Sequence, residues 1–432
     1  MKRKIEGALL SWKKSPARKP LVLNGARQVG KTYSILKFAK AEYGNHAHID
    51  FSAQKDIAAL FAADITPDAL VPQLRARLKT RLEPAETLLF FDEIQTCPRA
   101  LTSLKYFCEQ APHWHIIAAG SLLGVALGRE EYSYPVGKVD TAALHPMDFE
   151  EYLWARGEET LSQLIREAFD ENRALGLHDR ALRLMRDYWF CGGMPEVVRA
   201  TSSQAAPAAE IRRLQGAIVE GFLADMTKYA SPLDTAKLLN VWHGVPEQLA
   251  KKNHKFQYAT IASSARAHQY EAPVNWLKAA GLVSLCHRIT DALSPLGAFR
   301  EQGFFKLYLL DTGILTGLYG AEQSDLEPSA DKGSRFRGGI AENYVMQQLT
   351  AKGIDPFYWG TASKSEVDFV FGSKSGDIIP LEVKSGKNVT AKSLESYRNA
   401  YSPKYVIRCS TKNFGFENGI RSVPLYAASC IE

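Results

Sequence analysis

The feature that most constrains this chain is a glycine-bounded loop between an apolar run and a helical run. Leu21-Val22-Leu23 has the composition of a short buried strand, and Tyr33 to Tyr43 has helical periodicity. The segment between them satisfies the phosphate-loop pattern, in which a glycine, four variable residues and a second glycine precede lysine and threonine. Its residues are Gly25, Ala26, Arg27, Gln28, Val29, Gly30, Lys31 and Thr32.

A loop of this kind predicts that the chain binds ATP together with Mg²⁺. The glycines let the backbone curl so that its N–H groups face the phosphates, and the following helix contributes its N-terminal dipole. We expect Lys31 to reach the β and γ phosphates and Thr32 to offer its hydroxyl to Mg²⁺. The alternative is an ordinary turn without a ligand.

A second motif supplies the carboxylates that hydrolysis needs. The apolar run Leu88 to Phe91 is followed directly by Asp92 and Glu93. Such a strand delivers Asp92 to the metal and Glu93 to the attacking water, so the pair predicts turnover of ATP. A solvated strand end is the alternative interpretation.

Ser121 is a further candidate for the same site. It follows His115 to Ala119, another short apolar run of strand type. A hydroxyl at this position is placed to sense the γ-phosphate or the attacking water, and it is equally well placed to cap the next helix. Both interpretations stay open.

The pattern of apolar runs predicts an α/β protein in four segments. Residues 1–147 alternate short apolar runs with helical stretches, as in a parallel sheet flanked by helices. Residues 148–225 have helical periodicity and predict a helical lid. Residues 226–300 have the spacing of a winged helix, and residues 301–432 predict a mixed α/β domain, with the loop from Ala321 to Arg337 expected to be mobile.

An acidic cluster is predicted in the last segment. Asp368 lies on one predicted strand, and Glu382 and Lys384 lie on another, where residues two apart share a face. Together with Glu342 on a predicted helix, these carboxylates have the arrangement of a restriction-endonuclease-like site. There Asp368, Glu382 and Glu342 would hold Mg²⁺ while Lys384 orients water. A solvated salt-bridge network is the alternative, because Glu and Lys pairs often decorate sheets.

The distribution of charge predicts DNA as a partner. The chain has a net charge of +6. Residues 237–288 carry seven Lys or Arg against two acidic residues, and residues 360–412 carry nine against five. Because a polyanion meets such segments first, we expect DNA to bind there.

Membrane association is not expected from the sequence. No run approaches the roughly 18 apolar residues that a spanning helix needs. The basic first residues lack a secretory core and cleavage site, so the sequence predicts a cytoplasmic protein.

Several motifs together resemble a known family. The chain is similar to the prokaryotic AAA-type ATPases that carry a C-terminal domain of unknown function. The resemblance implies an AAA-type P-loop core, a helical lid, a winged-helix middle domain and a restriction-endonuclease-like end. The residues that carry it are Gly25 to Thr32, Leu88 to Gln95, Ala119-Gly120-Ser121, Tyr134 to Leu153, Gly192-Gly193-Met194-Pro195-Glu196 and Lys306 to Gly313.

Ring-forming ATPases of this type complete their site with an arginine from a neighbouring subunit. Arg129 and Lys138 are the candidates here, and relatives often have Gly-Arg where this chain has Gly137-Lys138. We therefore expect a homo-oligomer, and a ring is possible.

Three functions are consistent with these features. The first is an ATP-driven motor or remodeller of DNA, in which the stretch Pro273 to Ala280 lies nearest the duplex and Arg266 and Lys278 contact phosphates. The second is a nucleotide-gated signalling or defence ATPase that controls a nuclease. In the third, the terminal domain is a catalytically silent clamp.

Overall fold

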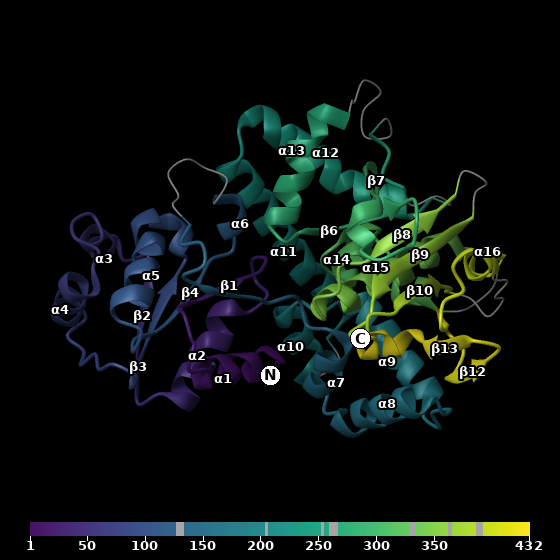
Figure 1. The fold of residues 1–432 in the computed structure, drawn as a ribbon, viewed down its shortest axis with the longest axis horizontal. Coiled ribbons are helices and arrows are strands. Elements are labelled where there is room, and N and C mark those ends of the chain that lie inside the picture. The colour runs from purple at the N-terminus through teal and green to yellow at the C-terminus, as the bar shows by residue number, and fades with distance from the viewer. Residues whose placement is uncertain are drawn as a thin grey trace. The chain divides into compact units, whose positions relative to one another are not determined.

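The computed structural model describes residues 1–126, 134–203, 206–251, 255–258, 267–327, 334–361, 365–385 and 392–432 (Figure 1). The chain divides into two compact units. The N-terminal unit comprises Lys2–His145 with Ala279–Gly281. The C-terminal unit comprises Pro146–Lys278 and Leu282–Glu432.

The N-terminal unit is built on a parallel five-stranded sheet with the order β2-β3-β4-β1-β5. Every residue of β3 and β4 is buried, as expected for inner strands covered on both faces. The sheet confirms the predicted α/β fold. Its strands are β1 (Leu21–Asn24), β2 (Asn45–Asp50), β3 (Thr87–Asp92), β4 (His115–Ala119) and β5 (Asp140–Ala143).

The edge strand β5 was not predicted from the sequence. Its residues alternate between half-buried and exposed, so it lacks the continuous apolar run of the inner strands. The helices of this unit are α1 (Ile5–Lys14), α2 (Lys31–Glu42), α3 (Lys55–Leu60), α4 (Pro67–Leu78), α5 (Pro98–Gln110) and α6 (Leu123–Ala126), with the 3-10 turn η1 (Ile94–Thr96).

The C-terminal unit begins with the helices that the periodicity predicts. Helix α7 starts after Asp148, whose side chain accepts from the backbone N–H of Glu151 in a capping box. The helices are α7 (Phe149–Ala155), α8 (Glu159–Glu171), α9 (His178–Cys191), α10 (Pro195–Ser203), α11 (Ala208–Tyr229), α12 (Pro232–Leu249), α13 (Ala267–Ala279), α14 (Thr312–Leu318), α15 (Ser334–Ala351) and α16 (Lys392–Tyr401).

A mixed eight-stranded sheet forms the rest of the C-terminal unit, with the order β12-β13-β11-β10-β9-β8-β6-β7. Its strands are β6 (Val283–Ile289), β7 (Arg300–Leu309), β8 (Phe357–Gly360), β9 (Glu366–Gly372), β10 (Ile378–Val383), β11 (Val406–Ser410), β12 (Gly415–Glu417) and β13 (Ile420–Pro424). The 3-10 turns of this unit are η3 (Leu296–Phe299), η4 (Gln323–Leu326) and η5 (Leu425–Cys430).

The predicted boundary between residues 300 and 301 falls inside this sheet. Strands β6 and β7 pair as an antiparallel hairpin, and β6 also pairs in parallel with β8. The hairpin of the predicted winged helix is therefore continuous with the terminal sheet. Part of the loop predicted from Ala321 to Arg337 is ordered as η4 and the start of α15, and residues 328–333 lie outside the described part.

A buried carboxylate joins two of the motifs on which the resemblance rests. Asp311 is fully buried, and its Oδ2 accepts from the N–H of Gly193 at 2.6 Å and from Gln347 Nε2 at 3.1 Å. Gly192 has φ +76, and a Cβ there would lie 2.1 Å from Asp311 Oδ1. The backbone of the turn between α9 and α10 packs directly against the Asp311 carboxylate. This contact leaves no room for a side chain and explains why glycine occupies the turn.

A histidine in the N-terminal unit generates a prediction about stability. Burial, helped by Arg18 and Lys13, lowers the pKa of His115 to about 4, and Nδ1 lies 2.8 Å from the hydroxyl of Tyr43. Because the unfolded pKa is about 6.5, folding favours the neutral ring. The stabilisation is complete above pH 6.5 and is lost as the pH falls through 4, at about 1.4 kcal/mol per unit of pKa difference.

The substitution His115→Gln should therefore flatten the decline in the free energy of unfolding between pH 6.5 and 4, as measured by urea titration at several pH values. The matched control is His113→Gln, because His113 is exposed. Equal pH dependence in parent and His115→Gln would contradict the assignment.

Candidate functional site

The loop after β1 has the backbone geometry that the phosphate-loop pattern predicts. Gly30 has φ +93 and precedes α2, and Gly25 has φ +150. A Cβ on Gly25 would lie 2.2 Å from the carbonyl oxygen of Leu144, so a side chain is sterically excluded there. Gln28 also has a positive φ of 66, which gives the loop its tight curl.

Lys31 closes this loop from inside. Its Nζ donates to the carbonyl oxygens of Gly25 at 2.7 Å and Ala26 at 2.8 Å. The residue is 8% exposed. A phosphate oxygen is a stronger acceptor for an ammonium group than these neutral carbonyls, so the donor set fits a nucleotide phosphate.

The loop and the acidic pair meet at the carboxyl ends of the strands. Thr32 Oγ1 donates to Asp92 Oδ2 at 2.8 Å, and Asp92 is 5% exposed. A hydroxyl and a carboxylate in contact are oxygen ligands of the kind Mg²⁺ takes, directly or through water. The structure thus brings Thr32, the residue after Lys31, into contact with Asp92.

Glu93 has an unusual backbone beside this contact. Its φ is +50 and its ψ is +41, in the left-handed region that costs a non-glycine residue on the order of 1–3 kcal/mol. Its N–H donates to Asp92 Oδ1 at 3.0 Å, and its carboxylate accepts from the side-chain amide of Gln95. Ser121 is buried directly after β4, the strand that pairs with both β1 and β3.

His48 belongs to the same site and was missed from the sequence. Its Nε2 lies 3.1 Å from Asp92 Oδ2, the oxygen that Thr32 also contacts. Its ring stacks on Phe90 with the centroids 4.7 Å apart. The pairing of β2 with β3 brings His48 to this position, and no local sequence motif around His48 predicts the contact.

Of the two candidates for a cation supplied in trans, the structure describes only Lys138. Lys138 Nζ lies 2.9 Å from Glu109 Oε1, so it already has a carboxylate partner within its own unit. Arg129 lies outside the described residues.

The acidic cluster of the C-terminal unit is assembled by three elements. Asp368 on β9 accepts from the backbone N–H of Val383 at 2.8 Å. Lys384 Nζ lies 2.6 Å from Glu382 Oε1 at the end of β10. Glu342 on α15 is 7% exposed. Burial raises the pKa of Asp368 to about 7, and the neighbouring Glu342 acts in the same direction.

A lysine and a tyrosine that the sequence analysis left out complete this cluster. Lys306 Nζ lies 3.3 Å from Glu342 Oε2, 2.8 Å from Glu366 Oε1 and 3.7 Å from Asp368 Oδ1. The Tyr308 hydroxyl donates to Glu342 Oε2 at 3.0 Å. Lys306 and Tyr308 are two apart on β7 and so share a face, which is the only signal the sequence offered.

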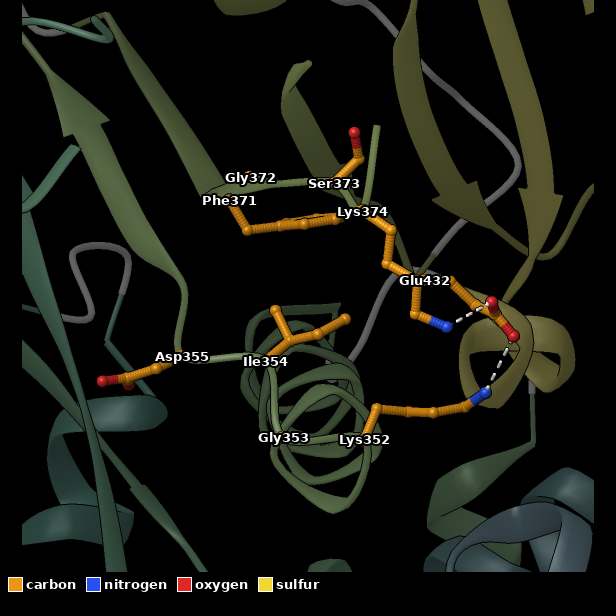
Figure 2. Close-up of a pocket in the computed structure, with 9 residues that line it drawn as sticks. All are labelled: Lys352, Gly353, Ile354, Asp355, Phe371, Gly372, Ser373, Lys374 and Glu432. Carbon is orange, nitrogen blue, oxygen red and sulfur yellow. Dashed lines mark hydrogen bonds and ion pairs between the residues drawn. The ribbon is translucent and has the colours of Figure 1, made fainter. Parts of the chain in front are cut away.

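A pocket of about 340 Å³ lies in the C-terminal unit but uses other residues (Figure 2). Glu432 is one of its lining residues, with its carboxylate 3.5 Å from Lys352 Nζ and 2.9 Å from Lys374 Nζ (Figure 2). None of the predicted site residues lines it. Its full lining is Lys352, Gly353, Ile354, Asp355, Phe371, Gly372, Ser373, Lys374 and Glu432.

Comparisons with protein families divide the chain in the same order as its motifs. An AAA domain family model matches residues 17–153. Two domains of unknown function, DUF8612 and DUF4143, match residues 182–325 and 337–428. The chain thus contains an AAA-type P-loop domain followed by two domains of unknown function. The sequence matches no curated protein.

Several solved structures are similar to this chain at low identity and with low TM-scores. The Walker-type ATPase of Pyrococcus abyssi is 16% identical, with a TM-score of 0.44 over 74% of this chain and 95% of that one. The ORC1 protein of Aeropyrum pernix, in a complex with DNA, is 11% identical, with a TM-score of 0.28 over 74% and 92%. RuvB of Thermotoga maritima is 16% identical, with a TM-score of 0.26 over 65% and 87%.

Within the described part of the chain, no helix combines the length and apolarity needed to cross a bilayer.

The contact between His48 and Asp92 generates a prediction about the metal. In the variant His48→Phe the ring can still stack on Phe90 but cannot donate to the carboxylate. Because partners that orient a metal ligand are typically worth 10- to 100-fold in metal affinity, we expect a weaker apparent affinity for Mg²⁺ by about tenfold. Mn²⁺ titration of the nucleotide-bound protein, followed by electron paramagnetic resonance, measures this directly.

The control variant is His46→Phe, one repeat earlier on the same face of β2. If His48→Phe and His46→Phe bind Mn²⁺ equally well, His48 does not position Asp92.

Proposed function

We propose that this ATPase hydrolyses Mg-ATP and uses the cycle to act on DNA. The single observation that carries the proposal is the hydrogen bond between Thr32 Oγ1 and Asp92 Oδ2, with Glu93 adjacent to it. This contact supports the proposal, because it joins the phosphate-binding loop to a carboxylate suited to Mg²⁺, next to a candidate general base.

Each residue of the site has a separate task in the proposed reaction. Lys31 exchanges its bonds to the loop carbonyls for the β and γ phosphates, and the N–H groups from Gly25 to Thr32 cradle them. Thr32 and Asp92 hold Mg²⁺, which when bound neutralises charge on the phosphates. Glu93 accepts a proton from the attacking water, and the amide of Gln95 fixes the direction of that carboxylate. Ser121 is proposed to sense the γ-phosphate.

The substitution Glu93→Gln tests this assignment. It removes the proton acceptor while keeping the size of the side chain, so ATP turnover should fall by about 10²- to 10⁴-fold, while Mg-ATP binding stays within a few-fold of the parent. Phosphate release and calorimetric binding measure the two quantities. The control is Glu86→Gln, because Glu86 is exposed just before the opposite end of β3. Unchanged turnover in Glu93→Gln would exclude Glu93 as the base.

The support for DNA comes from lysines of the predicted basic segment that face solvent. Lys278 is exposed near the end of α13, and Lys251 is exposed after α12. Other basic residues of the two predicted segments are engaged internally: Arg288 with Glu301 and Lys404 with Asp377. The charge available to DNA is therefore smaller than the sequence count, and Arg266 lies outside the described residues.

The substitution Lys278→Ala should weaken binding to every DNA sequence alike. If Lys278 contacts one phosphate, the slope of log affinity against log salt should become shallower by about 0.9. Lys404→Ala is the matched control, since Lys404 already pairs with Asp377 at 3.4 Å. Fluorescence anisotropy with linear, single-stranded and branched DNA, at several salt concentrations, provides the measurement. No salt-sensitive affinity for any of them would end the DNA proposal.

A second candidate function is a nucleotide-gated switch, in which the terminal domain is a regulated nuclease or a silent clamp. The observation that supports it is the cluster of Glu342, Asp368, Glu382 and Lys384, in which Glu342 and Glu382 are buried and which lies in the other unit from the ATP site. Turnover stimulated by DNA supports the motor, and turnover stimulated only by another protein supports the switch. Nicking of the same DNAs that Asp368→Ala abolishes supports the nuclease.

For the same ATPase function we propose a homo-oligomeric state. A homo-oligomer, with a ring as one form, would let a neighbour supply a cation to the ATP site in trans. Lys138 would first have to leave Glu109 to do so.

A further inference from the structure

The segment Lys306 to Gly313 is one of the chain's motifs, and ATP hydrolysis does not account for its first residue. Lys306 is 1% exposed on β7 of the C-terminal unit. Burying an ammonium group costs several kcal/mol unless charges compensate it. Its neighbours therefore have to explain why a lysine stands there.

Three carboxylates from two elements surround the ammonium group. Glu366 lies at 2.8 Å, Glu342 at 3.3 Å and Asp368 at 3.7 Å. These are N–O distances of an ion pair, longer than the roughly 2.0–2.6 Å at which Mg²⁺ or Ca²⁺ holds oxygen. Correspondingly, no group of three or more acidic, histidine or cysteine side chains among the described residues is arranged to hold a metal ion.

The electrostatics favour a charged lysine at this position. Glu366, Glu342 and Asp368 lie within 3.7 Å of the Lys306 ammonium group, and the Tyr308 hydroxyl donates to Glu342 Oε2 at 3.0 Å. The buried positive charge is thus compensated by neighbouring negative charge. The cluster is thus held together by an internal cation.

We propose that Lys306 is the resident cation of this cluster and that it excludes a divalent metal ion from the space between Glu342, Glu366 and Asp368. The proposal goes beyond the proposed function, because neither ATP hydrolysis nor DNA binding by the chain depends on it. It implies that metal-dependent chemistry in this domain requires Lys306 to withdraw.

The cluster retains the ligands that a divalent ion would need after such a withdrawal. Glu382 is 3% exposed, and its Oε2 has no hydrogen-bond partner among the described residues, while Oε1 pairs with Lys384. A buried carboxylate oxygen without a donor is costly, so it is a ready ligand for an incoming cation. The backbone N–H of Val383 meanwhile holds Asp368 in place.

The substitution Lys306→Met tests the proposal in the full chain without nucleotide. It removes the charge and keeps an unbranched apolar side chain, so the carboxylates lose their cation. We expect a lower melting temperature that Mn²⁺ raises again, and an affinity for Mn²⁺ at least about tenfold above that of the parent, since a positive charge a few ångströms away no longer repels the ion. Thermal melting and electron paramagnetic resonance of free Mn²⁺ measure the two effects.

Lys255→Met is the matched control. Lys255 also pairs with Glu366, at 3.3 Å, but its side chain is 26% exposed at the rim of the cluster. Its removal should not create a tight Mn²⁺ site. The double variant Lys306→Met with Asp368→Asn should lose the gain in affinity.

If Lys306→Met does not fold, a variant that keeps Lys306 still tests the proposal. With Lys306 in place, Asp368→Asn should leave the Mn²⁺ affinity of the nucleotide-free chain unchanged. A drop in that affinity would show that a divalent ion already binds between these carboxylates, and the proposal would be wrong. Equal Mn²⁺ affinities in the parent and a folded Lys306→Met variant would overturn it as well.

Discussion

Parallel pairing of β1, β3 and β4 is the constraint on which the nucleotide site depends. Because parallel strands end at the same edge of a sheet, the loop after β1 and the acids after β3 arrive together. The hydrogen bond between Thr32 and Asp92 at 2.8 Å is the direct result. Everything proposed about ATP follows from this edge, including the contact that His48 makes from β2.

In the C-terminal unit, buried charged side chains connect segments that are far apart in the sequence. The single segment from β7 to α14 supplies Lys306 to the acidic cluster and Asp311 to the two-glycine turn between α9 and α10. Both groups are almost fully buried, and each is satisfied by partners far away in sequence. Buried charges paired in this way specify one arrangement of the elements around them, since a lost partner leaves a buried charge uncompensated.

The sequence predicted the elements whose residues carry their own pattern. The strands β1, β3, β4 and β10 are continuous apolar runs, and the phosphate loop is defined by its glycines and lysine. The strands β5, β12 and β13 were not predicted, because they are partly exposed and lack such apolar runs. Strand β6 was assigned to a different domain from its partners β7 and β8, because which strands pair is not encoded locally.

The same distinction separates predicted from missed site residues. Lys31 and Asp92 stand in motifs with fixed spacing, whereas His48 and Lys306 enter their sites through the register of neighbouring strands and the packing of α15. The register decides which side chain meets which across a sheet, and a single sequence does not contain it. The count of basic residues also overestimated the positive charge available to DNA, since Arg288 and Lys404 pair with acidic residues of the same unit.

A crystal structure with Mg²⁺ and a non-hydrolysable ATP analogue would test the central claim most directly. The account predicts that Lys31 Nζ leaves the carbonyl oxygens of Gly25 and Ala26 for the β and γ phosphates, and that Thr32 and Asp92 meet the metal. An analogue bound elsewhere, with Lys31 still bonded to its own loop, would contradict it.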